Sequence, residues 1–577
     1  MDDLVIRGGT VVDGTGTPPR TADVAVSGGR IREVGEKLPA GRREIDASGL
    51  LVTPGWVDVH THYDGNLLWD PLLTPSSTHG VTTVVTGNCG VGLAPVRSAD
   101  LDWTIALMEG VEDIPGDVMR GGLAWDWESF PEYLDAVARV PRAIDAATQV
   151  PHAAVRVYAM GERGIDHTAV PTDDEIRRMG DLTAEAVVAG ALGFSTSRSV
   201  NHHASDGRLT PTLTAGAAEL IGIAEAVGRT GLGVFEAVFE DPIDTHFAIL
   251  RRMCEVSGRP MSVTTLQRPG QPSDGYREIL RQLEAADAAG LRMRGQVAPR
   301  PVGLLMSLAG RVHPLLGSAT YRSLAASAAS AAAAGADLSA ALRAPDVRER
   351  ILAELRASGT DPAARFAHSF ELGAPPSWDA DVRRSIGALA AARDTDQVEA
   401  AYDVVVGGGT IYTPVANFTD GNLAAVRDML VHPLTVPGLG DGGAHCTMIA
   451  DFDFPTFLMS YWARDVAEDQ RLPVEWVVKQ QCADTAALVG LTDRGVLAPG
   501  MKADINLIDF DRLGTTAPRI ARDLPSDGPR LLSSGVGYVA TVVSGQVAFE
   551  GGEHTGALAG ALVRGGGAPT QGAGSRK

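Results

Sequence analysis

The fold of this 577-residue chain is decided by residues 55–62, which run Gly-Trp-Val-Asp-Val-His-Thr-His. Apolar residues lead into two histidines that are two positions apart, and on a β-strand such residues point to the same face. Two imidazoles held together at a strand end can bind one divalent metal ion. Because histidines at this spacing also occur as ordinary polar residues at a strand exit, the surrounding sequence has to decide between the two interpretations.

Seven further segments have the length and apolar composition of buried strands, and helical patterns lie between several of them. They are residues 81–87, 153–160, 191–197, 231–239, 261–267, 291–298 and 435–440. With residues 55–62 they make eight strands, so we expect an α/β fold, a (β/α)8 TIM-like barrel with its active-site groups at the carboxyl ends of the strands. An open doubly wound sheet is the alternative, but no Gly-x-Gly-x-x-Gly motif follows the early strands.

Both ends of the chain carry a different pattern, in which short alternating strands are separated by Gly-rich turns. We therefore expect residues 1–54 and 491–560 to form one small β-sandwich domain. The barrel is expected over residues 55–490. The Gly-rich segment 565–577 is expected to be a flexible tail.

Two stretches within the barrel region, at about residues 97–151 and 300–432, are too long for simple loops. Both follow barrel strands on the side where the active site is expected, so they are predicted to surround the substrate entrance. The first stretch carries Trp103, Trp125 and Trp127. These side chains either line the entrance or pack in the core of the insertion.

Composition excludes several classes of protein. The chain has 50 Lys and Arg against 71 Asp and Glu, and the net charge of −21 opposes binding to nucleic acid or to an anionic membrane. It contains no run of about eighteen apolar residues, so no membrane span is expected. The acidic N-terminus lacks the features of a secretory signal, which favours a cytoplasmic protein. The expected partner is a small-molecule substrate, and assembly into a homo-oligomer stays open.

Lysine and cysteine are both scarce, and their positions limit the chemistry. Lysine occurs only at positions 37, 479, 502 and 577. The barrel strands therefore offer no lysine for a Schiff base or for a carbamylated, metal-bridging side chain. The four cysteines have no paired spacing, so a disulfide framework is not expected.

Several motifs along the chain together match a known family. They include Gly87-Asn88-Cys89-Gly90, Gly440-Asp441-Gly442-Gly443 and residues 6–14, 53–62, 79–83, 193–196 and 495–504. Through these motifs the chain resembles the amidohydrolase superfamily, in particular its N-acyl-D-amino-acid deacylase (D-aminoacylase) branch. The resemblance covers nearly the whole chain except the two long insertions.

The resemblance implies a metal-dependent hydrolase that acts on carbon–nitrogen bonds other than peptide bonds. It implies that His60 and His62 bind the metal and that Cys89, at the end of the second strand, is a thiolate ligand. Asp441 ends the eighth strand, and the resemblance makes it both a ligand and the catalytic base and acid. It would take a proton from the attacking water and pass it to the leaving nitrogen. Imidazole, thiolate and carboxylate together suit zinc.

The chain departs from this branch at the expected tight metal site. The branch has histidines at the ends of strands five and six, where this chain has Glu236 and Thr265. Glu236 remains a candidate further ligand, because glutamate binds metal ions, whereas threonine is a poor ligand. Thr265 and the absence of a bridging lysine favour one zinc ion over two.

Four residues near the expected strand ends are candidates for binding the substrate: Arg198, His202, His445 and Gln267. Gln267 falls near the position at which the branch has a lysine for the substrate carboxylate. Arg198 also suits a carboxylate, although a structural ion pair explains it equally well. His445 is expected either to contact the substrate or to pack in its loop. His202, in the loop after the fourth strand, is expected either to contribute to the site or to face the solvent.

Three functions are consistent with these observations. The leading one is metal-dependent hydrolysis of a linear amide, such as an N-acyl-D-amino acid or a related peptide-like substrate. The second is hydrolysis of a cyclic amide or lactone, which the missing lysine weakens. The third is a catalytically weak binding protein on an amidohydrolase scaffold, for which Glu236 and Thr265 are the motivation.

Overall fold

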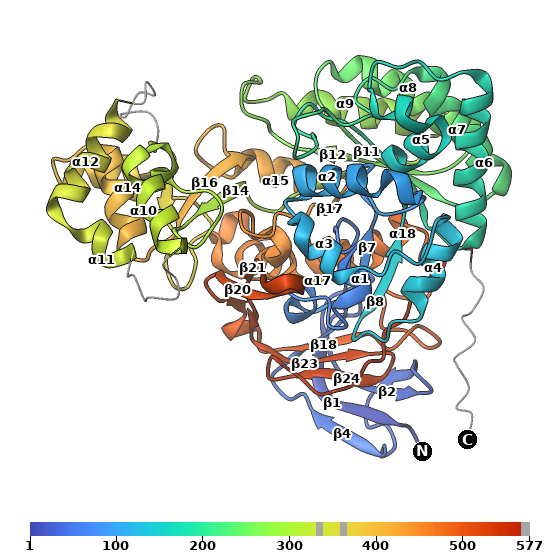
Figure 1. Cartoon of the computed structure of the whole chain (residues 1–577). Helices are drawn as coiled ribbons and strands as arrows, with labels where there is room; N and C mark the ends of the chain where they lie inside the picture. Colours follow the sequence, from blue (N-terminus) through green and yellow to red (C-terminus); the bar gives the residue numbers. More distant parts are fainter. Residues whose placement is uncertain (331–337, 358–365, 567–577) are drawn as a thin grey trace.

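The computed structural model describes residues 1–330, 338–357 and 366–566 (Figure 1). The chain has an α/β fold in which parallel strands are covered by helices. The main covering helices are α5 (His152–Met160), α6 (Asp173–Ala189), α7 (Ala217–Thr230), α8 (Ile243–Ser257), α9 (Tyr276–Ala288) and α15 (Ala424–Leu430). Residues 567–577 of the expected tail lie outside the described part of the chain.

The parallel strands pair in the orders β6-β7-β8 and β9-β10-β11-β12-β13-β17. Their bounds are β6 (Trp56–Asp58), β7 (Val81–Thr86), β8 (Asp145–Thr148), β9 (Val150–Pro151), β10 (Gly193–Arg198), β11 (Val234–Phe239), β12 (Met261–Thr265), β13 (Met293–Val297) and β17 (Thr435–Pro437). Only Gln149 separates β8 from β9. Beyond β6 and β17, the Asp441 N–H donates to the His60 carbonyl at 3.0 Å. The two sheets are thus linked by the chain on one side and by hydrogen bonds on the other.

One of the eight predicted strands is wrong. Residues 153–160 form most of helix α5, and the strand at this place in the sheets is made by β8 and β9 instead. A short apolar run does not distinguish a buried helix from a buried strand by its pattern. Here Ala, Arg and Met favour the helix, which packs against α6.

The two ends of the chain share one nine-stranded sheet, which Figure 1 shows in blue and red below the parallel strands. Its strands are β1 (Leu4–Val11), β2 (Arg20–Ser27), β3 (Arg30–Gly35), β4 (Arg43–Asp46), β5 (Leu51–Pro54), β18 (Ile505–Ile508), β23 (Tyr538–Val543), β24 (Gln546–Glu550) and β25 (Glu553–His554). The antiparallel pair of β5 and β18 joins the two ends. Buried apolar residues from both ends of the chain, including residues of this pair, form one core.

The first long insertion lies against the parallel strands, whereas most of the second forms a separate helical body (Figure 1). The first contains α2 (Leu101–Glu112), α3 (Gly116–Gly122) and α4 (Phe130–Ala138). The helices of the second are α10 (Ala319–Ser330), α11 (Leu338–Arg343), α12 (Pro345–Arg356), α13 (Ile386–Ala392) and α14 (Gln397–Val406), and they share an apolar core of their own. Within the described residues, no helix has the length and apolarity to cross a membrane.

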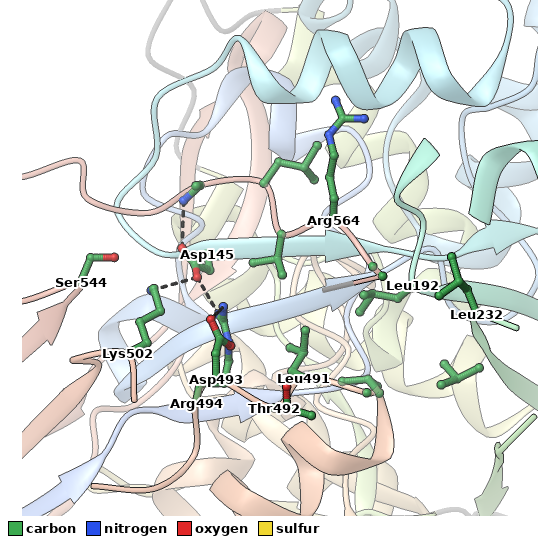
Figure 2. Close-up of a pocket in the computed structure, with 18 of the residues that line it drawn as sticks. Asp145, Leu192, Leu232, Leu491, Thr492, Asp493, Arg494, Lys502, Ser544 and Arg564 are labelled. Carbon is green, nitrogen blue, oxygen red and sulfur yellow. Dashed lines mark hydrogen bonds and ion pairs between the residues drawn. The ribbon is translucent and has the colours of Figure 1, made fainter. Parts of the chain in front are cut away.

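A cavity of about 670 Å³ lies where the shared sheet meets the amino ends of the parallel strands (Figure 2). Asp145, at the start of β8, pairs there with Arg494 at 2.6 Å and with Lys502 at 2.9 Å. These pairs tie the C-terminal part of the chain to the parallel strands. Asp145, Arg494 and Lys502 thus hold the shared sheet against the parallel strands, and the resemblance places the chemistry at the opposite, carboxyl ends of those strands.

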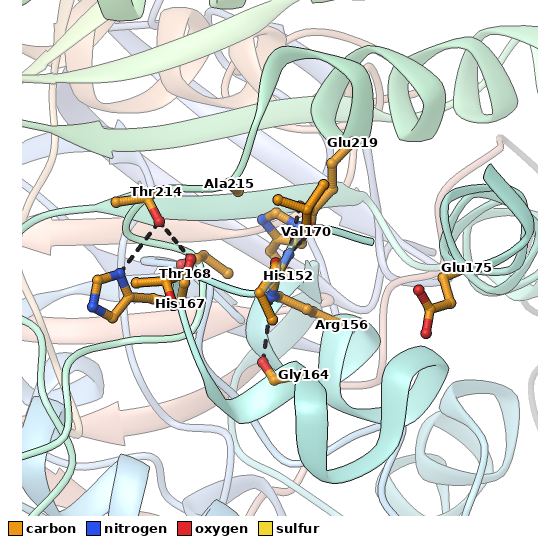
Figure 3. Close-up of polar contacts among 12 residues, drawn as sticks. His152, Arg156, Gly164, His167, Thr168, Val170, Glu175, Thr214, Ala215 and Glu219 are labelled. Atoms are coloured by element: carbon orange, nitrogen blue, oxygen red, sulfur yellow. Dashed lines mark hydrogen bonds and ion pairs between the residues drawn. The ribbon is translucent and has the colours of Figure 1, made fainter. Parts of the chain in front are cut away.

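A buried ionic network fixes α5 against α7 (Figure 3). The Arg156 guanidinium pairs with the Glu219 carboxylate at 2.5 Å, and His152 Nε2 lies 3.0 Å from the same carboxylate. All three side chains are at most 1% exposed. Burial opposes ionisation of Glu219, but the hydrogen bond with His152 and the charge of Arg156 outweigh it and lower the pKa of this carboxyl.

Replacing Glu219 by alanine should therefore destabilise the protein strongly. Arg156 would keep a buried charge without its partner, which costs about 3–5 kcal/mol of the free energy of unfolding. Glu225→Ala, an exposed glutamate on the same helix, is the matched control and should change that free energy by less than about 0.5 kcal/mol. Urea unfolding measures both, and equal losses for the two variants would contradict the prediction.

Candidate active site

Four predicted ligands come together at the carboxyl ends of the parallel strands. His60 and His62 follow β6, Cys89 follows β7 and Asp441 follows β17. The backbone of Cys89 and of Asp441 has a positive φ, 55° and 49° respectively, so both lie in sharp turns directly after their strands. All four side chains line one cavity of about 150 Å³.

His60, His62 and Cys89 approach one another closely enough to share one ion, and Asp441 lies beside the two histidines. Cys89 Sγ lies 3.4 Å from His60 Nε2. Asp441 Oδ1 lies 3.5 Å from His60 Nε2 and 3.6 Å from His62 Nε2. One ligand atom from each of His60, His62 and Cys89 falls within 4.8 Å of the others. The sequence-predicted cluster is thus assembled from three different strand ends.

The electrostatics of the cluster favour a bound cation. Burial, followed by the charges of nearby carboxylates, raises the pKa of the Cys89 thiol well above its usual range. Burial also raises the pKa of Glu236 to about 8. A divalent ion would compensate the negative charge of the acidic groups crowded into this buried site. The pKa of Asp441 is nevertheless lowered, since hydrogen bonding to His62 and the charges of both histidines outweigh its burial.

The donor atoms also fit a metal ion chemically. Two imidazoles, a thiol and a carboxylate form a set that suits zinc better than magnesium or calcium. Among the described residues, the buried atoms His62 Nδ1, Glu112 Oε1 and Glu236 Oε1 have no aligned hydrogen-bond partner. His62 Nδ1 and Glu112 Oε1 lie 3.2 Å from each other, so Glu236 Oε1 is the atom of the three that is left to bind a ligand.

Glu236 is placed beside the cluster by β11. Its Oε2 accepts a hydrogen bond from the Cys89 N–H at 3.0 Å. Thr265, at the end of β12, is fully buried and donates to the Val263 carbonyl at 3.3 Å. The carboxylate therefore holds the Cys89 turn in place and keeps one oxygen free, whereas the threonine hydroxyl is turned back toward its own strand.

Two of the four predicted substrate-binding residues line the cavity, and two do not. His202 and His445 are cavity residues. Arg198 donates instead to His246 Nδ1 at 2.8 Å and to the Ala215 carbonyl. Gln267 is engaged with Ser273, Asn417, Thr419 and Asp420, and so holds two loops together.

Two charged residues of the cavity were not predicted from the sequence. Arg268 directly follows Gln267, and it enters the cavity while donating to the Phe239 carbonyl at 2.9 Å. Glu112, at the end of α2, places its Oε1 3.2 Å from His62 Nδ1. Arg268 could have been found from the sequence, because it is the cationic residue next to Gln267 at the end of this strand. No local pattern marked Glu112.

The insertions contribute to the site only in part. Val111 and Glu112 from the first and Val302 from the second line the cavity. Trp103 and Trp127 are buried in the main core, and Trp127 donates to the Leu93 carbonyl at 3.0 Å. Among the described residues that line this cavity there is no tryptophan. The three tryptophans pack in or against the core, which is the second of the two expectations stated for them.

Comparison with known proteins identifies a family and several relatives to which this chain is similar. The model of the amidohydrolase family matches residues 43–549. D-aminoacylase of Alcaligenes xylosoxydans xylosoxydans is 36% identical over 292 residues, 50% of this chain and 55% of that protein. The chain therefore spans about half the length of this relative. N-acyl-D-glutamate deacylase of the same organism is 27% identical over 561 residues, 95% of this chain and 93% of that protein.

The solved structures agree with these relatives. A structure of D-aminoacylase, described by its binuclear metal centre with one-metal activation and second-metal attenuation, superposes with a TM-score of 0.65. It is 26% identical in sequence, and the match covers 98% of this chain and 100% of that one.

Proposed function

The chain belongs to the amidohydrolase family, and from this membership we propose that it hydrolyses a linear amide with the help of a bound metal ion. The proposed substrate is an N-acyl-D-amino acid or a related peptide-like molecule, as the names of its relatives suggest. The observation that carries the proposal is the meeting of His60, His62, Cys89 and Asp441 in one cavity. A cyclic amide or lactone is not favoured, since the names of these relatives describe the deacylation of linear amides.

We propose that His60, His62, Cys89 and Asp441 hold one zinc ion, with Glu236 as a further ligand. When bound, such an ion polarises the substrate carbonyl and makes a water molecule more acidic. The chain's own contribution is to place these donors and to keep the site enclosed: His60, His62 and Glu236 are each 1% exposed. Enclosure strengthens every electrostatic interaction in the cavity.

Asp441 performs the proton transfers in this proposal. An aspartate carboxylate is ionised at neutral pH, so it can accept a proton from the attacking water. The same carboxyl then donates that proton to the amide nitrogen, which leaves as an amine. His202 and His445 line the same cavity and are proposed to contact the substrate.

We propose that Arg268, rather than Gln267 or Arg198, binds the substrate carboxylate. Its guanidinium lies in the cavity, and among the described residues its one ion pair within 4 Å is with Glu240, at 3.7 Å. An arginine can bind a carboxylate through two parallel hydrogen bonds, which suits the α-carboxylate of an N-acyl amino acid.

Arg268→Ala should lower kcat/KM for an N-acyl amino acid by about 10- to 100-fold, mainly through KM, because a charge-assisted hydrogen bond is lost. The corresponding N-acyl amino acid amide lacks the carboxylate, so its already low kcat/KM should change little. Arg281→Ala, on the exposed surface of α9, is the control and should leave both values unchanged. Steady-state kinetics decide, and equal losses for the two substrates would assign Arg268 a structural role.

Two features of the fold, the closed barrel and the β-sandwich, are proposed here as well. We infer that the parallel strands close into a (β/α)8 TIM-like barrel over residues 55–490, which the links between β8 and β9 and between the ends of β6 and β17 support. Residues 1–54 and 491–560 are proposed to form one β-sandwich domain, and their shared sheet supports this.

Activity screening of the zinc-loaded protein tests the proposed function. The panel holds N-acyl-D-amino acids, their L-enantiomers, small peptides and cyclic amides. Hydrolysis of N-acyl-D-amino acids with clear preference over the cyclic amides is the expected result. A protein that hydrolyses only cyclic amides, or that binds zinc without hydrolysing any member, would refute the proposal.

A further inference from the structure

The two metal-binding histidines each have a side-chain partner on the ring nitrogen that faces away from the cluster. His60 Nε2 and His62 Nε2 are the atoms that approach Asp441, at 3.5 and 3.6 Å. Their Nδ1 atoms lie 2.7 Å from Gln296 Oε1 and 3.2 Å from Glu112 Oε1 respectively. Both rings can therefore carry their proton on Nδ1 and offer the lone pair of Nε2 to a metal.

The partner of His60 is itself fixed by a further contact. Gln296 Nε2 donates to Ser262 Oγ at 2.8 Å, which leaves Gln296 Oε1 to accept from His60. The partner of His62 is a carboxylate, which raises the basicity of a ligating imidazole more than an amide does. Glu112 is 1% exposed, and among the described residues neither its Oε1 nor His62 Nδ1 has an aligned hydrogen-bond partner, so each has the other, at 3.2 Å, as its close ionic contact.

Glu112 reaches this position because the end of α2 is anchored at several points. The Glu112 carbonyl accepts a hydrogen bond from the His445 N–H. Next to it, Asp113 accepts from the Thr447 N–H at 3.4 Å and pairs with Arg311 of the second insertion. The loop that carries Asp441 and both insertions thus meet at residues 112–113.

From this geometry we propose that Glu112 is a positioning residue of the metal site, which accepts the Nδ1 proton of His62 and aims its Nε2 at the metal. The inference rests on the metal-dependent function proposed above. It assigns a specific role to the first insertion, because the end of helix α2 supplies the carboxylate that contacts His62. Support of this kind changes metal affinity by about 10- to 100-fold.

The experiment compares Glu112→Gln with Asp102→Asn in the full-length protein. Asp102 is an exposed acid on the same helix, so its variant is the matched control. Zinc affinity is measured by competition with a chromophoric chelator, and the absorption spectrum of the cobalt form reports the ligand set. We expect Glu112→Gln to bind zinc about 10- to 100-fold more weakly, with an unchanged cobalt spectrum and an unchanged Tm of the metal-free protein. Asp102→Asn should match the wild type in all three.

Three results would overturn the proposal. Unchanged zinc affinity would show that Glu112 does not support the metal site. A changed cobalt spectrum would show that Glu112 is itself a ligand. A lowered Tm of the metal-free variant makes its role structural. Because no substrate is used, a protein that binds zinc through this arrangement but hydrolyses no N-acyl amino acid refutes the proposed substrate alone.

Discussion

Replacing Asp441 by asparagine is expected to lower kcat by about 100- to 10,000-fold, the usual contribution of a general base and acid, while zinc stays bound. Asparagine keeps the size of the side chain and one oxygen for the metal, but it cannot accept a proton. Asp441 is suited to both roles, because its Oδ1 lies 3.5 Å from His60 Nε2 in the same cavity. The measurements are kcat on the best substrate of the screen and zinc content by atomic absorption.

Asp469→Asn provides the control for this variant. Asp469 is exposed and distant in sequence from the strand ends, so its change from acid to amide should leave kcat and zinc content as in the wild type. A kcat of Asp441→Asn within about tenfold of the wild type would exclude Asp441 as the proton carrier. Loss of zinc in the same variant would make it chiefly a metal ligand.

Replacing Cys89 by alanine should remove zinc and activity together. The Cys89 thiol is the only sulfur in the cluster, and its Sγ lies 3.4 Å from His60 Nε2. Thiolate is the strongest zinc ligand of the set, and the metal compensates the cost of ionising this buried thiol. Zinc content after dialysis should fall from about one ion per chain to a small fraction of that value. Activity should fall in proportion.

Cys254→Ala is the matched control for this experiment. Cys254 is equally buried, on α8, but it is not part of the metal cluster. Its variant should lose a little stability, because a small buried side chain is truncated, and should keep its zinc and its rate. A Cys89→Ala protein that retains full zinc and full activity would show that Cys89 is not a metal ligand.

The cluster of His60, His62, Cys89 and Asp441 could be predicted because each of its residues belongs to a local motif. His60 and His62 share a strand face, and Cys89 and Asp441 each end a strand at a Gly-containing turn. The carboxyl ends of neighbouring parallel strands meet at one edge, so motifs that are far apart in the sequence converge there. The family resemblance then assigned the chemistry to these positions.

The substrate side of the site could not be predicted in the same way. Gln267 and Arg268 both follow the last residue of β12, where the alternation of the strand ends and no longer determines which side chain faces inward. Contacts with Asn417 and Asp420 hold Gln267 in the neighbouring loops, and Arg268 enters the cavity instead. Only packing between distant loops decides between two adjacent residues.

The amino-acid sequence by itself predicted seven of the eight parallel strands and the four side chains that meet beyond their carboxyl ends, because alternation along a strand and turn-forming glycines are local properties. The tertiary structure decided the helical state of residues 153–160 and the approach of Glu112 to His62. Both depend on contacts between segments far apart in the chain: α5 packs against α6, and α2 is anchored by the loop after β17. Burial against such partners outweighs local preference, so no pattern within one segment records it.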